Sequence, residues 1–431
     1  MDRKQHTTAH IAHIAHTLTP IVTLITLVGN CFLSFVVQNV STWKHAHPGG
    51  AAPIERYNGQ DGTVGERERE RERVVCLTRL AKDAFAAIHS REAWSQIERM
   101  KAIDADSSVL KACAPSSSLA LAMRSFRAEL ERDGFFTRSW SRDAFNVSLT
   151  LLWCAGGFAL AYKAPLVGML LLGLGMQQAG WIGHDYAHGR GAACWWITHV
   201  LSPLINGFSC DWWANKHNTH HVHPNQRGID EDIANDPILH LHAPESAAHD
   251  VWYRRYQHLY YHFAYAFLYV SWRIQSLQTA VKSRKWLELA PILVNYALLA
   301  CLPLHVSVGA ILLGGWFVAE VVTASHQSED MKDDIDHDFV KSQFTSTRDM
   351  ATDSLLWNYF WGGMQYQLVH HLFPTMPRYY YPAMVPKIHA FAKANGIEYR
   401  TAGLWEIWRL NYETMKKWAQ TPCKDQLKKT N

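Results

Sequence analysis

Charged residues are scarce in this sequence. Only 19% of its 431 residues are Asp, Glu, Lys or Arg, whereas 48% are hydrophobic and 12% are aromatic. The net charge of +4 is too small to indicate nucleic-acid binding, and no basic helix interleaved with aromatic residues supports it. We therefore expect no nucleic-acid partner, and a large apolar body of which part lies in a membrane.

Cysteine pairs with metal-binding spacing are also missing. The eight cysteines are scattered along the chain and none forms a CxxC motif, so the sequence indicates neither a zinc ribbon nor a disulfide framework. This pattern is typical of reduced loops that face the cytosol. Histidine, in contrast, is abundant, with 25 residues that must be examined cluster by cluster.

Two long apolar blocks predict membrane spans. Residues 145–182 are interrupted near Lys163 and Pro165, and residues 287–325 are interrupted at Pro303. Because such breaks favour tight turns, each block predicts two helices of roughly 18 residues, and the two blocks together predict four spans.

A third apolar block that could meet lipid lies near the N-terminus, and two further apolar stretches are interrupted by polar residues or proline. Residues 17–40 form a run near the N-terminus, and residues 191–213 and 258–273 are rich in Trp and Tyr, which is typical of segments at the membrane interface. Two crossings within 287–325 return the chain to the side on which it started. The basic loop 281–285 indicates that this side is the cytosol.

The histidines gather in three clusters: "HDYAH" (184–188), "HNTHH" (217–221) and "QLVHH" (367–371). His184 and His188 are one helical turn apart, so both rings project from one face of a helix toward one metal. In the second cluster His217 and His221 share a face. His220 lies beside them and is able to reach a second metal.

The third cluster repeats this spacing with Gln367 in the place of His217, followed by His370 and His371. Seven clustered histidines without a cysteine ligand argue against a structural zinc site, whose shell closes at four ligands, and favour at least two ions. Imidazole suits iron, copper, nickel and zinc. The apolar surroundings imply an apolar substrate, and its C–H bonds require a redox metal with dioxygen.

In this order, and around two apolar hairpins, "HDYAH", "HNTHH" and "QYQLVHHLFP" resemble the HxxxH, HxxHH and QxxHH boxes of membrane front-end fatty acyl desaturases. The resemblance covers residues 125–400 and includes "TSTRD" and "GGMQYQ". It implies a mostly α fold, namely an integral membrane desaturase body with four helical spans and a cytosolic histidine-box domain. It also implies two non-haem iron ions, with His326 in "VVTASHQ" as an additional ligand beside the box residues His184, His188, His217, His220, His221, His370 and His371.

The reaction implied by the resemblance inserts a double bond into a polyunsaturated acyl chain, between an existing double bond and the carboxyl end, with O2 and two electrons. The substrate would be a membrane lipid or an acyl-CoA, and cytochrome b5 with its NADH-dependent reductase would supply electrons at the endoplasmic reticulum. Gln367 marks the front-end group, and its amide either binds one iron weakly or orients a neighbouring ligand. Asp185 and Asp211 are candidates to accept hydrogen bonds from ligand N–H groups.

Residues 43–95 resemble the haem-binding half of an α+β cytochrome b5 domain. His47 in "HAHPGG" and His89 in "AFAAIHS" match its two axial haem ligands. They are 42 positions apart, and removal of residues 64–82 restores the family's spacing of 23. We interpret this Glu-Arg-rich insert as non-coding sequence carried into the gene model. The alternative is a charged, solvent-exposed helix, because neighbours three positions apart have opposite signs.

The N-terminal end of the chain also departs from the cytochrome b5 pattern. Residues 1–42 replace the expected soluble strand and helix with an apolar run, which is either a signal anchor or a translated intron. Because half a haem fold cannot bury enough surface to offset its ordering entropy, we expect little or no haem b to bind. Residues 401–431 are expected to form a C-terminal tail.

Three other interpretations stay open at this point. A hydroxylase with the same di-iron site would leave an oxygen on the lipid. A metal transporter would carry its histidines and acids inside the spans, whereas here the boxes lie at span ends and in loops. A non-catalytic relic is suggested by the N-terminus, although the boxes themselves are intact.

Overall fold

The computed structural model describes residues 37–39, 74–76, 117–189, 191–284, 286–333 and 338–426. The chain divides into two units, Met1–Ser117 and Ser118–Asn431. In the first unit, β1 (Val37–Asn39) and β2 (Val74–Cys76) pair antiparallel. His47 and His89, the predicted haem ligands, lie outside the described residues.

The first apolar block forms the predicted helical hairpin. Helix α7 (Trp140–Leu160) ends before a short turn that contains Lys163, and α8 (Pro165–His188) begins at the proline. Proline is favoured at the first helical position because the amide proton that it lacks has no partner there. The composition break in the sequence is therefore a turn between two long helices.

The second apolar block also forms a hairpin, in which α14 (Trp286–Ala300) and α15 (Leu304–Val322) are separated by a turn that ends at Pro303. Helices α7, α8 and α15 are long and apolar enough to cross a membrane. Helix α14 is apolar but has only 15 residues, shorter than the predicted span of roughly 18. The described residues thus contain three candidate spans and one shorter apolar helix.

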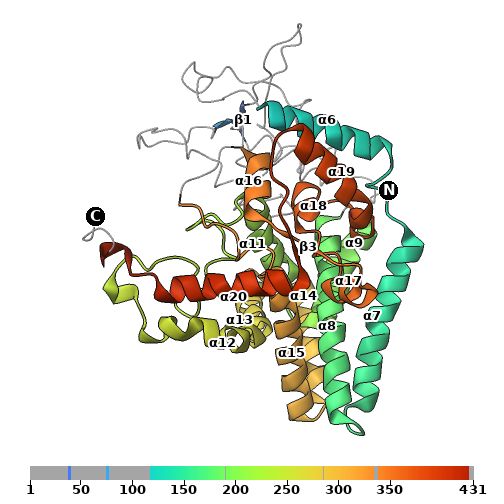
Figure 1. The fold of residues 1–431 in the computed structure, drawn as a ribbon. Coiled ribbons are helices and arrows are strands. Elements are labelled where there is room, and N and C mark those ends of the chain that lie inside the picture. Colours follow the sequence, from blue (N-terminus) through green and yellow to red (C-terminus); the bar gives the residue numbers. More distant parts are fainter. Residues whose placement is uncertain are drawn as a thin grey trace, which may run out of the picture. The chain divides into compact units, whose positions relative to one another are not determined.

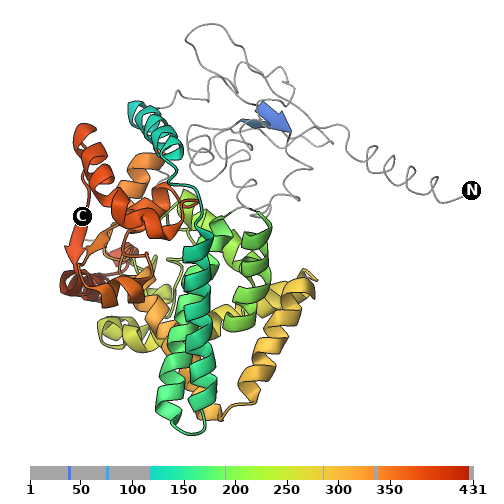
Figure 2. The same ribbon diagram turned by 90° about the vertical axis from the view of Figure 1, so that its right-hand side faces the viewer.

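Both hairpins turn at the same end. The hydroxyl of Tyr162 in the first turn donates to the carbonyl oxygen of Cys301 in the second turn, at 2.7 Å. Figures 1 and 2 show the two hairpins running in one direction away from α11 and α18. The opposite ends of α8 and α15 therefore lead into the same region, which contains the histidines.

Helix α15 packs closely against its neighbours at two glycines. A Cβ atom on Gly173 of α8 would lie 2.9 Å from the Cβ of Leu313, and one on Gly315 would lie 2.8 Å from the carbonyl oxygen of Ala266. Only glycine permits these approaches, as at other helix contacts inside membranes. The two glycines thus let α15 lie close to α8 on one side and to α12 (Gln257–Ala266) on the other.

The Trp- and Tyr-rich stretches are helical. The first contains α9 (Ala192–Trp196), the π-helix η2 (Ile197–Leu201) and α10 (Ser202–Asn206). The second lies in α12 (Gln257–Ala266) and α13 (Leu268–Lys282). Large apolar side chains, including Trp196, Phe263 and Phe267, are exposed on these helices.

Further helices and two strands lie outside the two hairpins. They are α6 (Ser118–Arg132), α11 (Cys210–Val222), η3 (Ala247–His249), η4 (Trp252–Tyr256), α16 (Phe339–Ser346), α17 (Leu355–Trp361), α18 (Gln367–Leu372), η5 (Arg378–Tyr380) and α19 (Tyr381–Ala394). Strands β3 (Asp349–Ala351) and β4 (Thr401–Gly403) pair in parallel, with Asp349 opposite Thr401. Figure 1 shows α11, α16 and α18 grouped above α8 and α15.

The described part of residues 401–431 packs on the helical body. It forms β4 and α20 (Leu404–Gln420), and α20 buries Ile407, Asn411, Met415 and Ala419 at intervals of four residues. The side-chain amide of Gln257 in α12 donates to the carbonyl oxygen of Met415 at 2.9 Å. Spacing of four places these residues on one face, which explains why a charged helix still has a continuous contact surface.

Candidate metal centre

The first histidine pair lies at the end of α8. His184 and His188 are one turn apart and buried, and the helix ends at His188 before Gly189. Their rings meet edge to face, with centroids 5.2 Å apart. The predicted shared face of a helix is therefore present.

Two further helices bring in the other boxes. Helix α11 carries the second box and is capped by Ser209, whose side chain accepts a hydrogen bond from the backbone of Trp212 at 3.1 Å. Helix α18 carries the third box and has only six residues, with the carboxylate of Asp349 accepting from the backbone of Leu368 at 2.8 Å. These caps satisfy amide groups that have no partner within the helix.

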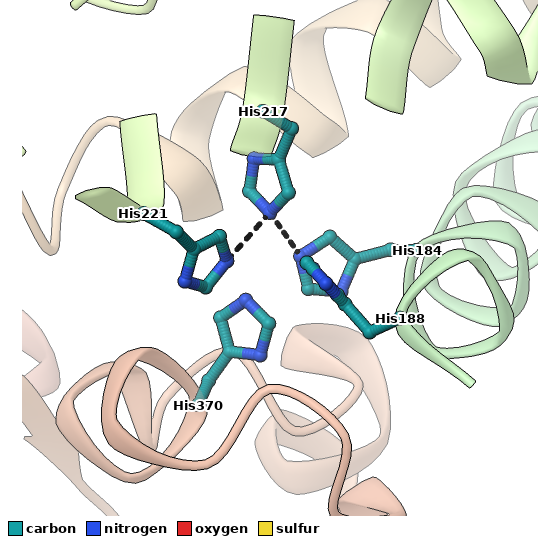
Figure 3. A group of neighbouring side chains, drawn as sticks. All are labelled: His184, His188, His217, His221 and His370. Carbon is teal, nitrogen blue, oxygen red and sulfur yellow. Dashed lines mark hydrogen bonds between the residues drawn. The ribbon is translucent and has the colours of Figure 1, made fainter. Parts of the chain in front are cut away.

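Five of the predicted ligands form the first histidine group: His184, His188, His217, His221 and His370. One ring nitrogen from each lies within 4.8 Å of the others. Nε2 of His217 is 3.0 Å from Nε2 of His184 and 2.9 Å from Nε2 of His221. Figure 3 shows the five rings, from α8, α11 and α18, pointing toward a common centre.

Three predicted ligands form the second histidine group: His220, His326 and His371. Nε2 of His220 lies 3.3 Å from Nε2 of His326, and the rings of His326 and His371 have centroids 4.8 Å apart. The side-chain Nε2 of Gln367 lies 2.8 Å from Nε2 of His326. The glutamine of the third box thus lies beside the second group.

The adjacent histidines of the boxes divide between the two groups. In α11, His221 joins the first group and His220 the second, and in α18, His370 joins the first and His371 the second. The rings of His221 and His371 stack between the groups, with centroids 4.4 Å apart. A histidine doublet therefore contributes one ring to each of two neighbouring sites.

Each ring of the second group has a hydrogen-bond partner on its outer nitrogen. Nδ1 of His220 lies 2.8 Å from a carboxylate oxygen of Asp230, Nδ1 of His326 lies 2.8 Å from the carbonyl oxygen of Ser346, and Nδ1 of His371 lies 2.8 Å from Oε1 of Gln343. All three partners are acceptors, so Nδ1 carries the proton and Nε2 faces the group with a lone pair. The boxes alone do not reveal these partners.

Two aspartates beside the boxes, Asp185 and Asp211, are the predicted acceptors for ligand N–H groups. The carboxylate of Asp185 pairs with the guanidinium of Arg138 at 3.2 Å, and a second carboxylate, Asp143, binds the same guanidinium at 3.3 Å. Asp185 is thus paired with Arg138, and its role as an acceptor for a ligand ring stays a prediction. The side chain of Asp211 lies outside the described residues.

Burial keeps most of the histidine rings on α11 and α18 neutral. It lowers the pKa of His221, His370 and His371 well below the usual value, and the neighbouring imidazoles lower it further. Burial alone would lower the pKa of His220 as well, but the carboxylate of Asp230 raises it above the usual value. Neutral imidazoles offer the lone pairs that metal binding requires.

The donor atoms fit metal ions. Buried atoms without a hydrogen-bond partner include Nε2 of His370, Nε2 of His371 and Oε1 of Gln367. Each buried polar atom left unsatisfied costs about 1–3 kcal/mol, so several in one place indicate a ligand that satisfies them. Two nitrogens bound to one ion at about 2.1 Å each lie about 3 Å apart, which matches the contacts around His217.

A cavity of about 500 Å³ reaches both groups. It is lined by His184 and His217 of the first group, by His220 and His326 of the second, and by Gln367. Aromatic and aliphatic side chains, including Phe208, Tyr269, Trp272 and Val318, form most of its other walls, while Lys216, Glu231, Asp232, Asn235, Asp236 and Gln275 line a polar part. The arrangement can bring a long apolar chain past two metal sites.

Comparisons with known proteins agree with this geometry. The family model described as fatty acid desaturase matches residues 126–403, which include both histidine groups. The chain is 28% identical over 400 residues to the acyl-lipid 8-desaturase of Rebecca salina, covering 88% of each protein. It is also 29% identical over 414 residues to a delta(6)-fatty-acid desaturase of Caenorhabditis elegans, covering 87% of this chain and 92% of that protein. A delta(8)-fatty-acid desaturase of Euglena gracilis is 28% identical over 386 residues, or 82% of this chain and 87% of that protein. With a family match over more than half of its length and its histidines converging beside an apolar cavity, the chain belongs to the fatty acid desaturase family and is an oxidoreductase.

Proposed function

We propose that this enzyme is a front-end desaturase that acts on a polyunsaturated acyl chain. The convergence of eight box and linker histidines into two adjacent groups on one cavity carries the proposal. The relatives named for the 6- and 8-positions support a double bond placed near the carboxyl end of the substrate. Such positions require the polar head of the substrate to lie close to the metal centre.

The ligand assignment follows the two groups. The five rings of the first histidine group would hold one iron, and the three rings of the second would hold the other, with the amide of Gln367 next to it. When bound, the two irons supply the dioxygen chemistry that removes two vicinal hydrogens from the acyl chain. With two electrons and two protons, O2 leaves as two waters and the C–C bond becomes a double bond.

The residues of the chain position the substrate and exclude water. The apolar walls around Phe208, Tyr269 and Trp272 would bind the hydrocarbon, and the polar part around Lys216 and Asn235 would face the carboxyl end, carried on a membrane lipid or on CoA. Water is kept from the metal by the same apolar walls, which limits side reactions. The cavity therefore selects both the orientation and the reacting carbons.

The membrane arrangement is also proposed. Helices α7, α8 and α15 would cross the endoplasmic reticulum membrane, and α14 would complete a fourth span, so that both histidine groups face the cytosol. The shared end of the two hairpin turns supports this arrangement. Tags inserted within 225–245 and after residue 400 should both be cytosolic, and a lumenal tag at either place would contradict it.

Electron supply concerns the N-terminal region. An alignment that covers 88% of the chain is longer than the segment 126–431, so the similarity to the Rebecca salina enzyme begins before residue 126. We propose that residues 43–95 derive from a cytochrome b5-like domain. Insert 64–82 would interrupt this domain, and residues 1–42 would replace the strand and helix that precede it. A separate cytochrome b5 with its NADH-dependent reductase would then donate the electrons. Purified protein should show little haem absorbance, and a stoichiometric Soret band with a bis-histidine spectrum would overturn this proposal.

Product analysis in yeast tests the activity. Cells expressing the chain are fed a panel of polyunsaturated fatty acids, and double-bond positions are read by mass spectrometry. New double bonds on the carboxyl side of existing ones are expected. Products that retain an oxygen would identify a hydroxylase, and unchanged fatty acids despite expressed protein, cytochrome b5 and iron would refute the proposal.

A further inference from the structure

Gln343 lies outside every histidine box, yet it contacts both histidine groups. It is on α16, and its side chain is fully buried. Its Oε1 accepts from Nδ1 of His371 at 2.8 Å, and its Nε2 donates to the backbone carbonyl oxygen of His221 at 3.1 Å. One amide thus joins the ring of His371 in the second group to the backbone of His221, whose ring belongs to the first group.

The contact with His221 determines which way the amide points. A carbonyl oxygen only accepts hydrogen bonds, so the NH2 end of Gln343 must face His221 and the oxygen must face His371. His371 then has to donate from Nδ1, and its Nε2, which has no hydrogen-bond partner, is left with a lone pair directed into the group. Gln343 therefore selects the tautomer of His371 that is able to bind metal.

The neighbouring ring in the doublet lacks such a determinant. Nδ1 of His370 lies 3.2 Å from the hydroxyl of Tyr381, and a hydroxyl both donates and accepts. In the second group, His220 and His326 face a carboxylate and a backbone carbonyl, which are acceptors only. Gln343 thus supplies the one side-chain amide among the three acceptors that orient the rings of the second group.

Gln343 also holds two helices at a fixed spacing. His221 is on α11 and His371 is on α18, and their rings stack with an interplanar angle of 29°. Helix α18 has six residues, too few to hold its position without tertiary contacts. A bond from its last turn through Gln343 to α11 restrains it where the doublets meet.

We propose that Gln343 is a positioning residue that presents Nε2 of His371 to the second metal ion and clamps α18 to α11. The proposal rests on the assignment of two metal ions in the proposed function. Loss of an oriented ligand partner outside the metal shell lowers metal affinity by roughly 10- to 100-fold in other proteins. The effect should fall on the second ion, because the five rings of the first histidine group remain in place.

The test compares three purified full-length variants in detergent. Gln343→Met removes donor and acceptor with little change of shape, whereas Gln343→Glu keeps the acceptor toward His371. Gln257→Met is the matched control, because Gln257 is equally buried and binds only backbone groups of His240 and Met415, outside both histidine groups. Anaerobic titration with Co(II), followed by its visible absorption, reports each ion without requiring turnover.

We expect wild type and Gln257→Met to bind two ions, Gln343→Met to bind the second ion roughly 10- to 100-fold more weakly, and Gln343→Glu to recover most of that affinity. Wild-type affinity for both ions in Gln343→Met would overturn the proposal, as would an equal loss in Gln257→Met. If Gln343→Met does not fold, Gln343→Glu decides, because Glu keeps the acceptor for His371 but loses the donor to His221. Retention of the second ion assigns the effect to the presentation of His371, loss of the second ion alone assigns it to the clamp, and equal weakening of both ions overturns the proposal. Failure of wild type to bind two ions would instead refute the proposed function.

Discussion

The two histidine groups differ in the number of their rings and in the hydrogen bonds that orient those rings. The first has five rings from three helices, and Nδ1 of His184 and Nδ1 of His221 in it have no hydrogen-bond partner. The second has only three rings, and each is oriented by an acceptor, namely Asp230, Ser346 or Gln343. The first group relies on the number of ligands and the second on the orientation of each one.

This difference has a chemical consequence. A site with five imidazoles has little room for another ligand, whereas a site with three and a neighbouring amide keeps positions open, as catalytic metals require. Oxygen is therefore expected to react at the side of the second group, where Gln367 and the cavity meet. The predictions below test this division, in order of decreasing effect.

Removal of a ligand from either group should abolish turnover, but the metal content should differ. His371→Ala leaves two rings in the second group, and His370→Ala leaves four in the first. Both should lower desaturation by at least roughly 100-fold, because ligands of one centre act as a unit. Metal analysis should show loss of one ion in His371→Ala and a smaller loss in His370→Ala. Full activity in either variant would contradict the ligand assignment.

Gln367→His should bind metal but react slowly. The added imidazole would lie beside His326 in a position with only 4% exposure, where it would compete for a coordination position on an ion bound by the second group. We expect both ions to be retained and turnover to fall roughly 10- to 100-fold. Gln365→His offers a control in the same segment, since Gln365 bonds to Asn358 and to the backbone of Gly363. Unchanged turnover in Gln367→His would show that the position is not used.

Two carboxylates near His220 should differ in importance. Asp230 is buried and lies 2.8 Å from Nδ1 of His220, while Asp232 lies 3.8 Å away and pairs with Lys216. Asp230→Asn should weaken binding of the second ion by roughly 10-fold or more, and Asp232→Asn should have a smaller effect. Titration of both variants with Co(II) measures the difference in affinity for the second ion. Equal effects would show that the distance of each carboxylate from Nδ1 of His220 does not determine its contribution.

The smallest effect should come from the cap of α11. Ser209→Ala removes the acceptor for the backbone of Trp212 and the hydroxyl that donates to Glu288. Loss of such a cap costs about 1 kcal/mol, which lowers the melting temperature by a few degrees. Since α11 supplies rings to both groups, metal content should stay unchanged, and a thermal shift assay with metal analysis separates the two results. Loss of one ion alone would show that the cap acts on one group.

The sequence predicts those features that depend on local chemistry. Lys163, Pro165 and Pro303 mark the turns because proline and charge interrupt apolar helices, and the spacing of the boxes predicts which histidines share a helix face. The choice of His326 as a ligand depends on the family resemblance, because no spacing connects it to a box, and its contact with Gln367 is seen only in the structure.

Other features depend on tertiary contacts and leave little signal in the sequence. Gln343 lies just before "TSTRD" and Ser346 lies within it, a motif noted only for its resemblance, and their roles follow from the packing of α16 between α11 and α18. Asp230 follows the second box closely and offers the clearest missed signal. The position of Asp185 within a box suggests a ligand ring as its partner, and the sequence gives no sign of its ion pair with Arg138, 47 positions earlier in the chain.

Because α8 lies so close to α15, residues that take no part in the reaction can still affect it. Gly173 lies 11 residues before His184, roughly 16 Å along the helix axis, and faces Leu313 of α15, the helix that leads to His326. A larger side chain there would act as a wedge between the helices and move His184 relative to His326. Searches for inactive variants should therefore find substitutions deep in the apolar helical bundle, far from the histidines, that change the spacing of the two histidine groups.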